Sequence, residues 1–180
     1  MNKNKFYGKY RATVINNVDP ELRGRLILSI PDVLSLIPST WAEPCTPLSG
    51  PTGPGMGVYM VPPIGAGVWV EFEQGDPNYP IWVGGRWGGA SDVPALAHAG
   101  LPASPNIVLQ SLGQNSIVIS DLPGPTGGLM LKSATGASII VNDTGIYIQN
   151  GKGASINLVG PAVKISGKPV NINEGALNII

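Results

Sequence analysis

The sequence predicts an all-β protein, in which a small N-terminal barrel precedes an intertwined trimeric β-helix, a triangular β-prism. Gly (25) and Pro (18) are abundant in the 180 residues, yet 43% of the chain is hydrophobic. That balance is typical of short strands joined by many turns. Helix signals are almost absent: only 95–100 is rich in alanine, and Pro94 and Pro102 confine it to about one turn. From residue 106 onward, short aliphatic pairs repeat.

The charge balance argues against several classes of function. Lys plus Arg equals Asp plus Glu at 11 each, so there is no net field to hold a nucleic acid or an anionic membrane. Cys45 is the single cysteine, so no internal disulfide can form. We find neither a signal peptide nor an apolar run long enough to span a membrane, and we therefore expect assembly in the cytoplasm.

Residues 1–90 are expected to form about five or six short strands that curve into a small closed barrel of the OB type. The predicted strands cover 5–16, 24–30, the region around Trp41, 58–61, a stretch containing Val68, Val70 and Phe72, and a return strand through Ile81 and Val83. Leu26, Leu28 and Ile30 share one face of the second strand. Between these strands, 42–57 is a Pro/Gly-rich loop with little regular pairing.

The last two barrel strands are expected to form a rigid hairpin. The sequence Asp76-Pro77-Asn78 suits a type I turn, with Asp at the first position and the fixed φ of proline at the second. Residues 91–105 are then expected to form a connector, and residues 106–180 have a different sequence pattern.

Nine aliphatic pairs, each with its members two residues apart, recur after the connector. They are Ile107/Leu109, Ile117/Ile119, Leu129/Leu131, Ile139/Val141, Ile146/Ile148, Ile156/Leu158, Val163/Ile165, Val170/Ile172 and Leu177/Ile179. Such self-similarity, punctuated by Gly and Pro, indicates a β-helix or β-prism with two inward aliphatics in each strand. Nine stacked levels at about 4.8 Å would make a needle roughly 40 Å long.

One chain with so short a repeat cannot close an interior around these pairs. Burying eighteen aliphatics is worth on the order of 30–50 kcal/mol per chain, and three chains around one axis would achieve it. We therefore predict an obligate trimer, with each chain contributing one face at every level and with stiffness coming from backbone pairing between chains. The predicted trimer core is Ile139, Val141, Ile146, Ile148, Ile156, Leu158, Val163, Ile165, Val170 and Ile172.

The residue between the members of each pair points outward, and its character drifts along the chain. It is apolar or aromatic at Val108, Val118, Met130, Ile140 and Tyr147, and polar at Asn157, Lys164, Asn171 and Asn178. Apolar outer residues need cover, whereas Asn and Lys favour water. We expect the upper part of the needle to be wrapped by the connector or neighbouring strands, and the lower part to be bare.

The first ninety residues resemble the OB-fold domain of VgrG proteins and of phage central-spike proteins, baseplate assembly protein V. The resemblance rests on "RGRLILSIP" (23–31), "TWAEP" (40–44), the glycines at 53, 55 and 57, and "VPPIGAGVWVEFEQGDPNYPIWVGG" (61–85). It implies a trimeric spike at the tip of a contractile injection machine, located in the baseplate of a phage tail or phage-tail-like particle. A hub protein would then lie above the barrels, and the needle would contact the target membrane mechanically.

Within this family, a PAAR-repeat protein caps the needle, and the resemblance places its docking site at Leu177, Asn178, Ile179 and Ile180. Some relatives carry a lysozyme domain between barrel and needle, where this chain has about fifteen residues. Others end in a His-x-His metal tip, but His98 is the only histidine here and lies in the connector. We therefore expect no catalytic residues, no metal and no cofactor.

The eleven acidic residues are scattered, which argues against an enzyme, because acid/base chemistry needs titratable groups gathered in a cleft. The alternative function is an OB module that binds single-stranded nucleic acid or sugar by stacking on Trp41, Trp69, Trp82 and Trp87. Against it, the balanced charge supplies no electrostatic attraction for a nucleic acid.

Overall fold

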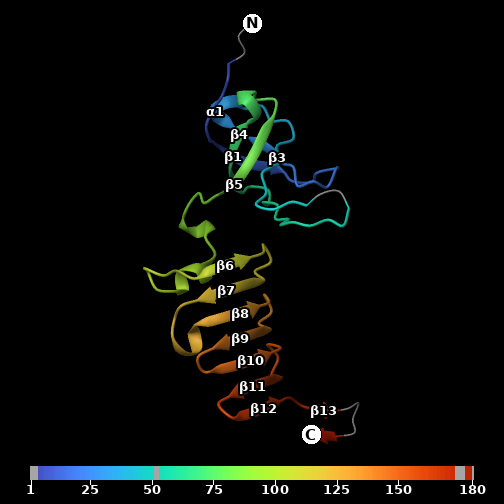
Figure 1. Cartoon of the computed structure of the whole chain (residues 1–180), viewed down its shortest axis with the longest axis vertical. Helices are drawn as coiled ribbons and strands as arrows, with labels where there is room; N and C mark the ends of the chain where they lie inside the picture. The colour runs from blue at the N-terminus through green and yellow to red at the C-terminus, as the bar shows by residue number, and fades with distance from the viewer. Residues whose placement is uncertain (1–3, 51–52, 173–176, 180) are drawn as a thin grey trace. The chain divides into compact units, whose positions relative to one another are not determined.

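The computed structural model describes residues 4–50, 53–172 and 177–179, which are almost entirely strands, turns and short helical turns (Figure 1). The chain divides into two compact units, one up to Ala90 and one from Ser91.

The first unit is a five-stranded barrel. Its strands are β1 (Tyr10–Asn16), β2 (Ile27–Ser29), β3 (Glu43–Pro44), β4 (Gly67–Phe72) and β5 (Pro80–Arg86), with the helical turns α1 (Pro31–Leu34) and η1 (Glu73–Gly75). The sheet order is β2-β1-β4-β5-β3, antiparallel except for the parallel pair β3–β5. A bridge between Leu26 and Ala42 joins the segments just before β2 and β3, so the curled sheet closes on itself.

The barrel interior holds the side chains that the alternation predicted. Leu26, Leu28 and Ile30 are fully buried, as are Val68 and Val70. With Ala12, Val14, Ala42, Phe72 and Trp82 they form one hydrophobic cluster. The period-2 pattern fixes which face of each strand points inward, because a shift of one residue would expose the whole set.

The β4–β5 hairpin is confirmed in detail. The backbone N–H of Tyr79 donates to the carbonyl of Asp76 at 3.0 Å, which closes a four-residue turn with Pro77 at its second position. The Asp76 carboxylate also accepts from the backbone N–H of Asn78. At Gly75, φ is +75° and a Cβ would lie 3.1 Å from the Tyr7 ring. Glycine is required there by both backbone conformation and space.

Three sequence predictions for this unit need correction. The first strand starts at Tyr10 rather than at residue 5, and the strand expected around Trp41 is limited to Glu43–Pro44. Residues 58–61 form no strand. For the last two, the physical reason is the Pro/Gly content of the long β3–β4 segment, which leaves few backbone groups able to continue a ladder.

A buried ion pair organises the β1–β2 loop. The Asp19 carboxylate accepts from the Arg25 guanidinium at 2.7 and 3.0 Å, and from the backbone N–H groups of Glu21, Arg23 and Arg25. Both side chains are buried, and the Arg25 guanidinium lies 5.4 Å from the centre of the Trp41 ring. The Arg25 hydrogen bond, helped by the backbone donors, lowers the pKa of Asp19 well below its usual range, although burial opposes this shift.

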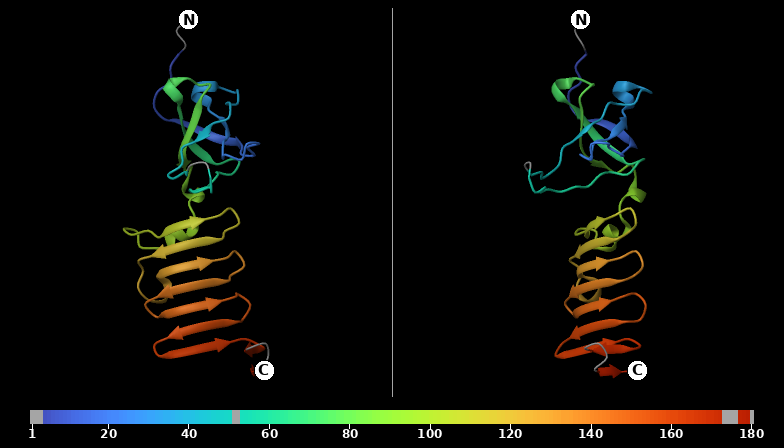
Figure 2. Two further views of the ribbon diagram at one scale, coloured as in Figure 1. Left: turned by 45° about the vertical axis from the view of Figure 1, so that its right-hand side comes forward. Right: turned by 90° about the vertical axis from the view of Figure 1, so that its right-hand side faces the viewer.

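The second unit contains a seven-stranded antiparallel sheet in which neighbours in sequence are neighbours in space (Figure 2). Its strands are β6 (Ile107–Gln110), β7 (Ser116–Ser120), β8 (Gly128–Lys132), β9 (Ser138–Asn142), β10 (Gly145–Gln149), β11 (Ser155–Val159) and β12 (Ala162–Ser166). A separate two-stranded sheet joins β13 (Val170–Ile172) to β14 (Leu177–Ile179). Each of the nine predicted aliphatic pairs lies on one of these nine strands.

The strands of the seven-stranded sheet are connected differently at their two ends. At one end of the strands, which we call the loop edge, five-residue loops span 111–115, 133–137 and 150–154. In each, the first residue donates its backbone N–H to the carbonyl of the fifth, and the fourth has a positive φ (64° at Gln114, 94° at Gly136 and 101° at Gly153). At the opposite end of the strands, the connections are two-residue turns at 143–144 and 160–161 and the longer loop 121–127.

This connectivity corrects the expectation that backbone pairing in the needle runs between chains. From β6 to β12, every ladder is formed inside one chain, because short turns return each strand antiparallel to the one before it. The expected stack of nine continuous levels is also wrong, since the continuous sheet ends at β12. Six spacings of about 4.8 Å make this sheet about 29 Å long.

Among the described residues, two helical turns contact the β6–β9 part of the sheet. The helical turn η3 (Ala95–Ala99), which follows η2 (Ala90–Asp92), contacts β6, and η4 (Gly124–Thr126) contacts β9. Asn142 donates from its side chain to the carbonyl of Pro125, which ties the η4 loop down. Val118 is 3% exposed, whereas Lys164 and Asn171 are exposed. Val108, Ile140 and Asn157 are all half-buried, and Asn171 belongs to β13 outside this sheet, so the contrast between a wrapped upper part and a bare lower part stays a prediction.

The Asp19–Arg25 pair predicts acid sensitivity of the barrel. Because the pKa of Asp19 is lower in the folded state than its ordinary value of 3.8, its stabilising contribution is complete above about pH 4 and disappears as the pH falls further. Asp19→Asn should destabilise the barrel at pH 7, and its difference from wild type should shrink below pH 4. Chemical unfolding followed by tryptophan fluorescence measures this, since all four tryptophans lie in residues 1–90.

Asp32→Asn is the matched control, because Asp32 is exposed. A constant difference between wild type and Asp19→Asn from pH 7 to pH 2 would contradict the role assigned to the pair.

Candidate trimerisation face

Fourteen aliphatic side chains line one face of the seven-stranded sheet in two columns. Strand register places them opposite one another, strand after strand. The first column, next to the loop edge, contains Leu109, Ile117, Leu131, Ile139, Ile148, Ile156 and Ile165. The second contains Ile107, Ile119, Leu129, Val141, Ile146, Leu158 and Val163. We call the two columns together the aliphatic face.

The aliphatic face is exposed in a single chain. Its fourteen side chains keep between 38% and 69% of their surface accessible. Soluble monomers rarely show so large a contiguous apolar surface. Burying what remains exposed is worth on the order of 10–20 kcal/mol per chain, which is comparable with the whole stability of an ordinary domain.

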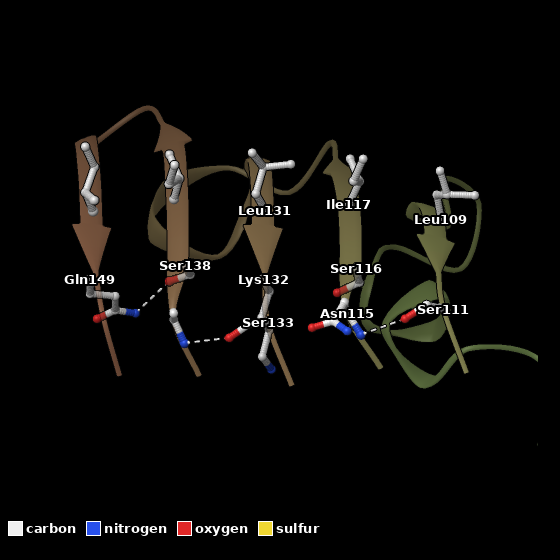
Figure 3. Close-up of a pocket in the computed structure, with 13 residues that line it drawn as sticks. Leu109, Ser111, Asn115, Ser116, Ile117, Leu131, Lys132, Ser133, Ser138 and Gln149 are labelled. Carbon is white, nitrogen blue, oxygen red and sulfur yellow. Dashed lines mark hydrogen bonds between the residues drawn. The ribbon is translucent and has the colours of Figure 1, made fainter. Parts of the chain in front are cut away.

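A hollow runs along the first column, between the aliphatic side chains and the loop edge (Figure 3). It has a volume of about 540 Å³ and is lined by aliphatic side chains on one side and by the small polar residues of the loops 111–115 and 133–137 on the other. Leu109, Ile117 and Leu131 lie side by side in it. A second hollow continues beside the same column past Ile156 and Ile165.

Most polar groups at the rim of the hollow bond to one another (Figure 3). Gln149 Nε2 donates to Ser138 Oγ at 2.9 Å, Asn115 N to Ser111 Oγ at 3.2 Å, and Ala137 N to Ser133 Oγ at 3.0 Å. Lys132 is the only charged residue among those that line it. Apart from Lys132 and the buried Ser116 hydroxyl, which has no hydrogen-bond partner, the surface therefore offers an apolar partner a contact with little cost of desolvating polar groups.

The structure places the predicted core residues as follows. Eight of them, from Ile139 to Ile165, belong to the aliphatic face. Val170 is half-buried in β13, outside the seven-stranded sheet, and the side chain of Ile172 lies outside what the structure describes. Six further aliphatics, which belong to the predicted inward pairs but precede the core residues named from Ile139 on, lie on the same face: Ile107, Leu109, Ile117, Ile119, Leu129 and Leu131.

The predicted tip residues are only partly described. The backbone of Leu177, Asn178 and Ile179 forms β14 and pairs with β13, with Asn178 opposite Asn171. Their side chains and the whole of Ile180 lie outside the described residues.

Both units match known family models. Residues 106–178 match the phage baseplate V C-terminal trimerisation domain. Residues 10–87 match the type VI secretion system/phage-baseplate injector OB domain. The chain belongs to the phage baseplate V family. The two matches together account for more than four fifths of its length, and the aliphatic face lies within the matched trimerisation domain. No curated protein matches the chain closely enough to serve as a relative.

Family membership confirms the resemblance drawn from the sequence and the OB assignment of the barrel. The protein is a structural component of the phage-baseplate and type VI spike type, and its trimerisation domain supports a homotrimer. In the described part of the chain, no three His, Cys, Asp or Glu side chains come together as metal ligands. None of the described helices has the length and apolar character of a membrane span.

Ile156 and Asn157 offer a matched test of the aliphatic face, because they are neighbours in β11 and point to opposite sides of the sheet. Ile156→Asp should abolish trimers, since each chain would bring a carboxylate into the dry interior at a cost of about 3–5 kcal/mol. Light scattering of the purified chain measures this as a drop from three times 18.7 kDa.

Asn157→Asp is the control and should remain trimeric, because its side chain is on the outer face. A folded trimer of the Ile156→Asp chain would show that the aliphatic face is not the interface.

Proposed function

We propose that this protein is the membrane-piercing central spike of a contractile injection system, with three copies packed through their aliphatic faces into a rigid shaft. The observation that carries the proposal is the aliphatic face, which fourteen side chains form and one chain leaves open. Membership of a baseplate family with a trimerisation domain supports it.

Three sheets meeting through their aliphatic faces make a triangular prism. Each chain supplies one side of the prism, and the columns of all three fill its interior with aliphatic side chains alone. The outer faces stay outside, which agrees with the cover over Val118 and with the exposed Lys164. In a cyclic trimer each interface joins two different surfaces, so the loop edge of one sheet meets the opposite edge of the next.

This construction suits a part that transmits force along its axis. Strands cross the axis, and continuous ladders of backbone hydrogen bonds in each chain connect one level to the next. The interdigitated interior resists buckling, because close-packed aliphatic cores have low compressibility. The role is mechanical, and it needs no catalytic residue or cofactor.

The barrels would connect the shaft to the hub of the baseplate above them. Their fixed hairpins and the Asp19–Arg25 pair make them rigid bodies suited to holding a shaft in place. The alternative function, in which the barrel binds single-stranded nucleic acid or sugar, receives less support. Trp82 is buried with its Nε1 donating to the Gly24 carbonyl, and Trp41 faces Arg25, so two of the four proposed stacking platforms are already occupied.

Particles assembled with variant chains test the spike function. With Ile156→Asp in place of the wild type, the baseplate should lack its central spike in electron micrographs, and delivery of particle contents across the target envelope should fall to background. Asn157→Asp particles should deliver as the wild type does. Normal delivery by particles that lack the spike would contradict the proposal.

A PAAR-repeat protein is the proposed tip partner. The residues of β14 and Ile180 give the segment 177–180 an aliphatic sequence, and β13 and β14 pair only with each other within the described residues. Strand edges and clustered aliphatics favour an added partner.

Deleting residues 177–180 should abolish capture of the PAAR-repeat protein while the shaft stays trimeric. The measurement is a pull-down from the purified components, with light scattering to confirm the trimer. Lys152→Ala, in the loop 150–154, is the control and should bind as the wild type does. Undiminished capture by the truncated chain would refute tip docking at this segment.

A further inference from the structure

The segment between β3 and β4 extends from the barrel as an arm (Figure 2). We call residues 45–62 the arm; the structure describes all of it except 51–52. A bridge between Ser49 and Gly57 makes its outer part a small hairpin, and Val58 N donates to the Leu48 carbonyl at 3.0 Å. A Cβ on Gly57 would lie 2.6 Å from that carbonyl, so the two sides of the hairpin are in close contact.

The surface of the arm is unlike one that faces water. Leu48, Met56, Tyr59 and Met60 are each at least half exposed. No charged residue occurs between Glu43 and Glu71, although charged side chains are common on solvated surfaces. A projecting hairpin of this composition is typical of a segment that is covered in the assembled protein.

A hollow of about 350 Å³ lies beside the base of the arm. One side of it is made by Val58, Met60 and Val61, and the other by Trp82 and the glycines Gly84 and Gly85 of β5. Every residue that lines it is uncharged, and Cys45 is among them. Each barrel therefore carries both an apolar projection and an apolar recess of matching chemistry.

We infer that the tip of the arm, around Leu48 and Met56, packs into the hollow of the neighbouring barrel in the trimer. Each contact joins the arm of one chain to the hollow of the next, which are two different surfaces. Three such contacts related by a threefold axis close into a ring in which every arm and every hollow is occupied. The ring would lock the barrels together independently of the shaft.

A second copy is the occupant that the observations favour. The trimerisation domain on the same polypeptide holds three barrels together, and the 15-residue connector 91–105 can span no more than about 50 Å. Linkage of this length gives an effective concentration in the millimolar range. Since the arm and the hollow are both uncharged, neither needs a partner of opposite charge.

The inference rests on the homotrimer of the proposed function, and cross-linking distinguishes the two. The native Cys45 thiol lines the hollow, and Met56→Cys places a second thiol at the tip of the arm. Treating the full-length Met56→Cys trimer with a short bismaleimide should give covalent dimers and trimers on a denaturing gel.

Two control chains make the result specific. Cys45→Ser/Met56→Cys should give monomers, because the tips do not meet one another. Leu36→Cys, which keeps Cys45, should also give monomers, because Leu36 is 99% exposed on the barrel outside the arm.

The remaining outcomes overturn the inference. Only monomers from a Met56→Cys sample that light scattering shows to be trimeric would mean that the arm does not reach the next barrel, with the spike proposal intact. Dimers from the Cys45→Ser/Met56→Cys chain would mean that the tips contact each other instead. A monomeric mass before cross-linking would instead refute the homotrimer itself.

Discussion

The structure depends on one constraint: the described residues of the second unit leave the aliphatic face of its single sheet uncovered. The outer side of the same sheet shows the contrast, because Val118 is buried there, while the fourteen side chains of the aliphatic face remain exposed. Since burying them is worth as much as an ordinary domain's stability, association and folding of this unit are expected to be linked. The trimerisation-domain match agrees with this physical requirement.

The two units solve the problem of strand edges and exposed faces differently. The barrel closes on itself through the Leu26–Ala42 bridge and buries its core within one chain. The sheet of the second unit remains open: within the described residues, β6 and β12 each pair on one side only, and the aliphatic side chains stay exposed. In the proposed shaft this division would add stiffness, because the hydrogen-bond ladders and the apolar interior each resist a different deformation.

Much of the fold follows from local pattern. Alternation predicted the inward faces of β2 and β4, and the Asp76-Pro77 turn follows from the known φ of proline and the side-chain acceptor of Asp. The aliphatic pairs located all nine strands of the second unit. The Asp19–Arg25 pair was missed, since a turn aspartate gives no local sign that an arginine six residues later will fold back on it. The true start of β1 and the absence of a strand at 58–61 also depend on partners that lie elsewhere in the barrel.

The sequence by itself determined the fold class, the different sequence patterns of the two units and the need for partners, because periodicity and composition indicate which side chains must leave water. Only the tertiary structure decided that consecutive strands pair within one chain and that the continuous sheet ends at β12. Those features depend on turn geometry and register, and pairs two residues apart are equally compatible with strands that wind between chains and strands that fold back. The five-residue loops and two-residue turns make the difference, because they return each strand beside its predecessor.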